Sequence, residues 1–211
     1  MLSFVVIVCT IGAVTGYASG PPTSACADMY PTGHETNAQT GTPYFEITTA
    51  ENTYSAGGTV TVTLTATSNY YEGVFVQARR ATSNCSDGTN DGAVGSFTIP
   101  NGDTFLQLIS CNGIAGGAVA HKTSSHQTSK TITWTAPAQT VGQIYFRGVF
   151  VRNEETFWTD IFSSVVKPTG DTSTDLTVCP VRTTLNGSGA NRPIAIVILL
   201  STIITVLSRG V

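Results

Sequence analysis

The segment TVTVTLTA, from Thr59 to Ala66, alternates threonine with an apolar residue at every second position. Successive side chains of an extended strand point to opposite faces, so this pattern predicts a strand with a buried apolar face and a threonine face toward water. Threonine also suits an extended backbone because its β-carbon is branched. Since no segment of the chain shows a convincing amphipathic helical period, the alternation predicts an all-β fold.

Other short segments repeat this alternation and are separated by turn signals such as PNGD at Pro100–Asp103. Seven to nine such strands, with turns every 8–15 residues, predict an immunoglobulin-like antiparallel β-sandwich with two sheets. We expect the clearer strands at Gly73–Arg79, Thr104–Ser110, Ser129–Pro137, Gln143–Arg152 and Phe157–Val166, and weaker ones at Tyr44–Thr49, Ala93–Thr98 and Gly117–His121.

The first residues, MLSFVVIVCTIGAVTG, are apolar from Phe4 to Val14 and are followed by small residues. This layout is typical of a secretory signal peptide, although its first residues lack Lys and Arg. We expect a signal peptide over residues 1–18, with cleavage after Gly16 or Ala18. A buried N-terminal strand is the alternative interpretation.

The chain ends in a second apolar run, from Ile194 to Leu207. As a helix this run would be about 21 Å long, whereas a bilayer core is about 30 Å thick. Small polar residues precede it, and that order is the signal for a glycosylphosphatidylinositol (GPI) anchor, in which the tail is removed. A short single span and a terminal core element remain alternatives. The expected lipidation sites are Asn186, Gly187 and Ser188, in a stalk over residues 168–192, before a hydrophobic propeptide or short membrane segment over residues 193–211.

Both ends predict a protein on the extracellular face of the cell membrane, attached by a lipid anchor, with secretion or a single short C-terminal span as alternatives. Charged residues make up only 11% of the chain, and its 10 Lys and Arg are scattered. Nucleic-acid binding needs a concentrated positive surface, so this composition excludes it.

Four cysteines lie outside the expected signal peptide: Cys26, Cys85, Cys111 and Cys179. In an exported domain they predict two disulfides, for which three pairings exist. Their spacings contain no CxxC or CxxH, so a zinc site has little support. The sequon NCS makes Asn84 the expected glycosylation site, because the second sequon, at Asn186, competes with lipid attachment.

Residue patterns typical of catalysis are missing from the sequence. There is no GxSxG motif, and the glycine-rich runs lack the lysine of a phosphate-binding loop. The three histidines, His34, His121 and His126, are expected in loops, and the carboxylates near Phe157 at a solvated hairpin. We therefore predict no catalytic residue, no metal, no cofactor and no enzymatic activity.

Several longer segments together resemble one known family. The opening SGPPTSACADMYPTGH, at Ser19–His34, is similar to the start of a reeler (reelin-type) domain, with its Cys, Met-x-Pro and His. The resemblance extends over residues 19–167 as a reeler domain, with Pro21, Ala56 and Ala120 departing from the family pattern. Its further motifs follow in family order: YSAGGTVTVTL, YYEGVFVQARR, GSFTIP, FLQLISC, GAVAHKT, TITWTAP and GQIYFRGVFVRNEETFW.

The resemblance implies a disulfide between Cys26 and Cys111, which leaves Cys85 to pair with Cys179. It also implies non-catalytic binding in one of three settings. Small invertebrate members act in innate defence, through microbial surface or haemocyte recognition. Others act in adhesion to cell-surface or matrix proteins. A third group carries the domain beside the haem-bearing membrane module of ferric-chelate reductase-like proteins, which this chain lacks.

Among these settings we expect innate defence, with microbial surface glycans as partners. Adhesion to cell-surface or matrix proteins is the alternative, and an accessory module related to ferric-chelate reductases is less favoured. Candidate contact residues are Tyr70, Tyr71, Arg79 and Arg80 in the YYEGVFVQARR segment, and ordinary positions within the sandwich are the alternative interpretation of these four.

Overall fold

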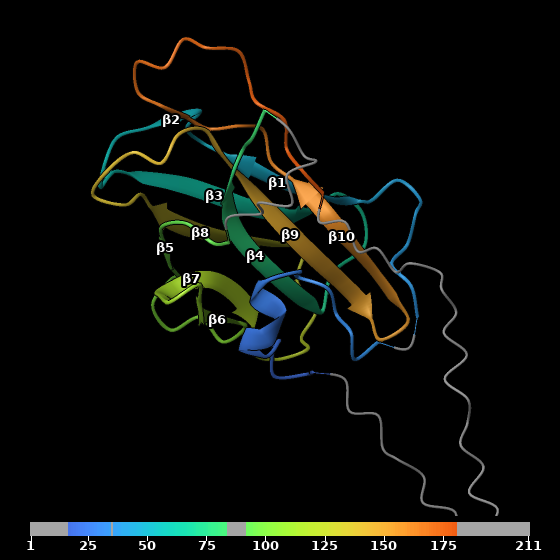
Figure 1. The fold of residues 1–211 in the computed structure, drawn as a ribbon. Helices are drawn as coiled ribbons and strands as arrows, with labels where there is room; N and C mark the ends of the chain where they lie inside the picture. The colour runs from blue at the N-terminus through green and yellow to red at the C-terminus, as the bar shows by residue number, and fades with distance from the viewer. Residues whose placement is uncertain (1–16, 35, 84–91, 181–211) are drawn as a thin grey trace, which may run out of the picture. The chain divides into compact units, whose positions relative to one another are not determined.

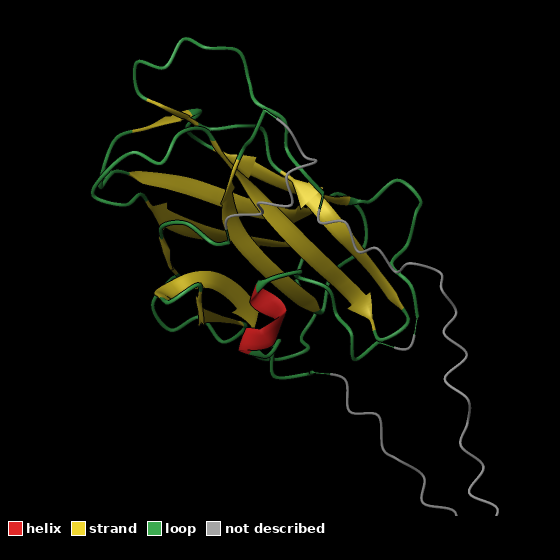
Figure 2. Ribbon diagram, in the orientation of Figure 1, coloured by secondary structure: helices red, strands yellow, loops and turns green. Residues whose placement is uncertain are grey.

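A computed structural model describes residues 17–34, 36–83 and 92–180 of the 211-residue chain. In these ranges the regular structure consists of β-strands and one short 3₁₀ turn, η1 (Thr23–Cys26). Figure 2 shows that turn in red beside a body of strands. The predicted all-β class is confirmed.

The strands form two antiparallel sheets and one small parallel pair (Figure 1). The first sheet has four strands in the order β1 (Phe45–Thr49), β3 (Thr59–Ala66), β8 (Ser129–Thr135) and β5 (Ser96–Thr98). The second has five, in the order β10 (Thr156–Phe162), β9 (Ile144–Asn153), β4 (Gly73–Arg80), β7 (Ile114–His121) and β6 (Leu106–Cys111). The short strands β2 (Thr53–Tyr54) and β11 (Lys167–Pro168) pair in parallel.

Strand β3 buries the residues that its alternation predicts. Val60, Val62 and Leu64 are inaccessible to solvent and pack in the main core between the two sheets. Aromatic rings fill the centre of this core, where Phe45 stacks on Phe150 at 4.9 Å between ring centroids. Trp134 is also fully buried and donates a hydrogen bond from its Nε1 to the carbonyl oxygen of Val94 at 2.8 Å.

The observed strand limits differ most from the expected ones at three places. Strand β7 begins three residues earlier than expected, whereas β5 includes only the last part of Ala93–Thr98. Strand β10 ends at Phe162 rather than Val166, and its register shifts between Trp158 and Ile161, where Asp160 adopts a φ of 59°. Alternation of residue types does not reveal such irregularities.

The segment after β11 packs on the sandwich up to the last described residues, although the sequence suggested that a stalk begins at residue 168. The buried side chain of Gln143 donates to the carbonyl oxygen of Thr174 and accepts from the backbone N–H of Leu176, at 2.9 and 2.8 Å. Thr177 also exchanges two backbone hydrogen bonds with Thr82. The polar composition of this segment did not predict that it packs on the sandwich, because the side chain of one internal glutamine, Gln143, provides hydrogen-bond partners for it. No helix among the described residues is long and apolar enough to cross a membrane.

Candidate functional site

The N-terminal segment, residues 17–34, covers the outer face of the five-stranded sheet. The disulfide implied by the resemblance is present: Cys26 in η1 is bonded to Cys111 in β6, with 5.5 Å between their Cα atoms. Met29 of this segment is buried and joins a second apolar cluster with Phe75 and Val149. As a result β4 is buried on both of its faces.

Two buried arginines hold the N-terminal segment to the sheet. The Nη2 of Arg79 in β4 donates to the carbonyl oxygens of Cys26 and Ala27, at 2.7 and 3.2 Å. The Nη2 of Arg147 in β9 donates to the carbonyl oxygen of Asp28 at 3.0 Å. Burial, together with the charge of Arg147, lowers the pKa of Arg79 to about 10, so the group stays protonated at neutral pH.

Two of the four candidate contact residues are buried, which corrects their expected place at the surface. Tyr71 and Arg79 have exposed fractions of 0% and 1%, and neither reaches a partner molecule. Arg79 is buried because the N-terminal segment covers its face of the sheet, and Tyr71 because it packs against Phe105 and Phe150 in the main core. Arg80 is exposed at the end of β4, and Tyr70 is half-buried at the surface.

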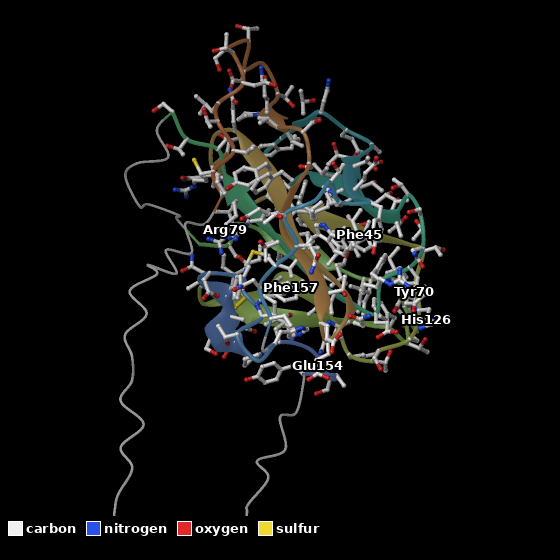
Figure 3. All side chains as sticks on the ribbon, turned by 90° about the vertical axis from the view of Figure 1, so that its right-hand side faces the viewer. Phe45, Tyr70, Arg79, His126, Glu154 and Phe157 are labelled. Atoms are coloured by element: carbon white, nitrogen blue, oxygen red, sulfur yellow. A yellow bond between two sulfur atoms is a disulfide. The ribbon has the colours of Figure 1, made fainter. Side chains whose placement is uncertain are left out.

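A surface cluster surrounds Tyr70 at the beginning of β4. The ring of His126 stacks on that of Tyr70 at 3.6 Å between centroids (Figure 3), and the guanidinium of Arg152 lies 4.9 Å from the Tyr70 ring centroid. The Nε2 of His126 is 2.9 Å from the Oε1 of Glu72. Because the His126 side chain is 59% exposed, this group of residues, here called the Tyr70 cluster, is accessible from solvent.

A cavity of about 510 Å³ lies between the N-terminal segment and the outer face of β4 and β9. Cavities of roughly 300–1,000 Å³ are the usual size of small-molecule sites. Phe75, Val149 and Val151 from the sheet face Met29 and the prolines of the segment across it. Glu72 belongs both to this cavity and to the Tyr70 cluster.

His121 lies in the wall of the cavity and is held by the backbone on both sides. Its Nε2 is 3.1 Å from the carbonyl oxygen of Tyr17, and its Nδ1 is 3.2 Å from both the backbone nitrogen and the carbonyl oxygen of Val74. A neutral ring with its proton on Nε2 donates to Tyr17 and accepts from the N–H of Val74. Burial lowers the pKa of His121, which favours the same neutral form.

The three histidines lie at separate positions in the structure and have different partners. His34 contacts the carbonyl oxygen of Glu154 through Nδ1 at 2.6 Å, and its ring meets the edge of Phe157. Within residues 17–34, 36–83 and 92–180, no group of three or more His, Cys, Asp or Glu side chains is placed to hold a metal ion. Of the carboxylates near Phe157, Asp160 binds Arg147 at 2.7 Å.

Some predicted site residues lie outside the described residues. These are Cys85, Asn84, Asn186, Gly187 and Ser188, together with residues 1–16 of the expected signal peptide. Cys179 is described, is nearly buried and is disulfide-bonded. Its pairing with Cys85 stays a prediction.

The fold is therefore a disulfide-linked antiparallel β-sandwich whose outer sheet face is covered by an N-terminal segment. A family model described as "Reeler domain" matches residues 24–174, and the chain belongs to this family. Crystal structures of the human F-spondin reeler domain share the fold; one has a TM-score of 0.50 and 19% sequence identity, and the match covers 64% of this chain and 94% of that one.

Two kinds of relative share more of the sequence. The chain is 34% identical over 170 residues to the "Putative defense protein Hdd11" of Hyphantria cunea. The match covers 78% of this chain and 96% of the relative. It is 33% identical over 198 residues to the "Putative ferric-chelate reductase 1" of Danio rerio, which covers 90% of this chain. The chain spans only 33% of the length of that relative.

Proposed function

We propose that this chain is a non-catalytic extracellular binding protein of innate defence that recognises microbial surface glycans. The observation that carries the proposal is the nearly full-length match to a defence-named relative, which covers 96% of that protein. The match to the reductase-named relative covers only a third of that protein, so its name gives less support for this chain.

The Tyr70 cluster is the surface that we assign to glycan recognition. Aromatic rings provide flat apolar faces for the C–H side of a sugar ring, and charged groups beside them bind hydroxyls. The exposed ring of His126, stacked on Tyr70, supplies the flat apolar face, and Glu72 and Arg152 supply the charged groups. A hydrogen bond with Tyr44 raises the pKa of Arg152, which keeps its charge at any physiological pH.

The two apolar ends of the sequence support attachment to the outside of the cell. We propose export through the N-terminal signal and attachment by a GPI anchor at Asn186, Gly187 or Ser188. The test is expression of the full chain in animal cells, followed by phosphatidylinositol-specific phospholipase C. Release into the medium is the expected result, and protein that stays on treated cells contradicts the anchor.

The released protein then tests recognition. We expect capture on beads coated with lipopolysaccharide or β-glucan, and loss of most of that capture in a Tyr70→Ala/His126→Ala variant. Glu46→Ala is the control, because Glu46 is exposed on β1 of the four-stranded sheet, outside the Tyr70 cluster. Binding only to matrix proteins or to a cell receptor, or unchanged capture by the double variant, would overturn the assignment.

A further inference from the structure

The cavity beneath the N-terminal segment is chemically different from the Tyr70 cluster. Its sheet side consists of Phe75, Val149 and Val151, and its opposite side includes Pro22 and Met29. The outer sheet face is therefore only partly filled by the segment that covers it. An apolar surface of this kind gains free energy when an apolar molecule displaces water from it.

The charged side chains that line this cavity are acidic, while His126 contacts Glu72 and Arg147 contacts the carbonyl oxygen of Asp28 from outside the lining. Asp28, Glu72 and Glu154 line it, and no Lys or Arg is among its described lining residues. His121 adds no positive charge at neutral pH, since burial lowers its pKa. Hydrogen bonds leave acceptor capacity on these acids: Asp28 uses its Oδ1 for the N–H of Tyr30, and Glu72 uses its Oε1 for His126.

We propose that this cavity binds a small apolar molecule that carries a cationic head group, such as an alkyl amine. The alkyl part lies on the apolar side chains of β4 and β9, and the ammonium lies near the carboxylates. An anionic amphiphile meets these carboxylates at this position and binds more weakly. The proposal is independent of glycan recognition, apart from Glu72, which both sites share.

Fluorescence of the neutral apolar probe N-phenyl-1-naphthylamine provides the test, with the processed protein released from cells. Three competitors of equal chain length separate the charge classes: decyltrimethylammonium, decanol and decyl sulfate, each below its micelle concentration. We expect the cationic competitor to displace the probe at a concentration at least tenfold lower than decyl sulfate. Equal or better displacement by decyl sulfate, or no saturable probe binding, would overturn the proposal.

Two variants locate the site. Asp28→Asn/Glu154→Gln should remove the preference for the cation and leave the affinity for decanol unchanged, because asparagine preserves the Oδ1 acceptor for Tyr30. Ala25→Phe should fill the cavity and abolish probe binding. Glu46→Gln is the control, since Glu46 is exposed on the four-stranded sheet.

These variants also separate the two proposals. The Asp28→Asn/Glu154→Gln variant should keep its capture on β-glucan or lipopolysaccharide beads, because neither residue belongs to the Tyr70 cluster. If Ala25→Phe does not fold, a Val151→Phe variant tests the same space from the sheet side. An unchanged preference in the double charge variant contradicts the site even where the probe binds.

Discussion

Arg79 and Arg147 lie on the neighbouring strands β4 and β9, and each guanidinium is about 99% enclosed by protein. Within residues 17–34, 36–83 and 92–180, the Nη1 of each has no hydrogen-bond partner. Arg147 is paired with Asp160, whereas Arg79 bonds to Gln77 and to backbone carbonyls. Two buried cations are thus stabilised by backbone carbonyls, the side chain of Gln77 and a single carboxylate.

Asp160→Asn should lower the free energy of unfolding by about 3 kcal/mol, because it leaves the charge of Arg147 buried without its partner. Asparagine tolerates the φ of 59° at this position, so the loss reports on charge rather than on backbone strain. Chemical denaturation followed by tryptophan fluorescence measures it. Asp175→Asn is the control, since its pair with Lys167 lies at the surface and should contribute less than about 1 kcal/mol.

The Cys26–Cys111 disulfide closes a loop with a sequence separation of 85. The chain-entropy estimate for such a loop is about 4–5 kcal/mol. A Cys26→Ala/Cys111→Ala variant should therefore unfold at a much lower denaturant concentration than the wild type. A midpoint within experimental error of the wild type would show that the arginine contacts alone hold the N-terminal segment.

His121 should make stability fall on acidification. Because the pKa of His121 is lowered in the folded state, the unfolded chain takes up the proton first as the pH falls below about 6.5. The stabilisation is complete above that pH and is lost progressively toward the folded-state pKa. Denaturation midpoints at pH 7.5 and 5.5 measure this.

A His121→Gln variant isolates the contribution of this residue. Its decrease in stability between the two pH values should be smaller than that of the wild type, because glutamine does not titrate. His126→Gln serves as a comparison, since His126 lies at the surface in contact with Glu72. Equal pH dependence in wild type and His121→Gln would contradict the assignment.

Gly95 permits the close packing of Trp134. It has a φ of 64°, and an added Cβ would collide with the Trp134 indole and lie 2.6 Å from the carbonyl oxygen of Thr135. Gly95→Ala should cost about 3 kcal/mol, from backbone strain and overpacking together. Gly102→Ala, at a φ of 75° with open space around it, should show only the backbone part, about 1 kcal/mol. Thermal denaturation of both variants checks the difference.

The candidate surfaces depend on features that the sequence alone did not predict. Tyr70 and Tyr71 are adjacent in the sequence, yet one contributes to a surface cluster and the other is fully buried. Arg79 has the polarity of a surface residue, and only the carbonyls of a segment about 50 positions earlier allow its burial. Neither the His126 stack nor the cavity leaves a signal in the sequence, because both join residues that are distant along the chain.

Period-two alternation alone determined the strand at Thr59–Ala66 and its buried face, because side-chain direction in a strand follows from local backbone geometry. The resemblance of the chain's motifs to the family, in family order, indicated the Cys26–Cys111 pair from the sequence alone. Tertiary structure decided that the five-stranded sheet is covered on its outer face, that Arg79 and Arg147 are buried there, and that a cavity remains beside them. These features depend on which segments, distant in the sequence, pack against one another, and local residue patterns do not determine that packing.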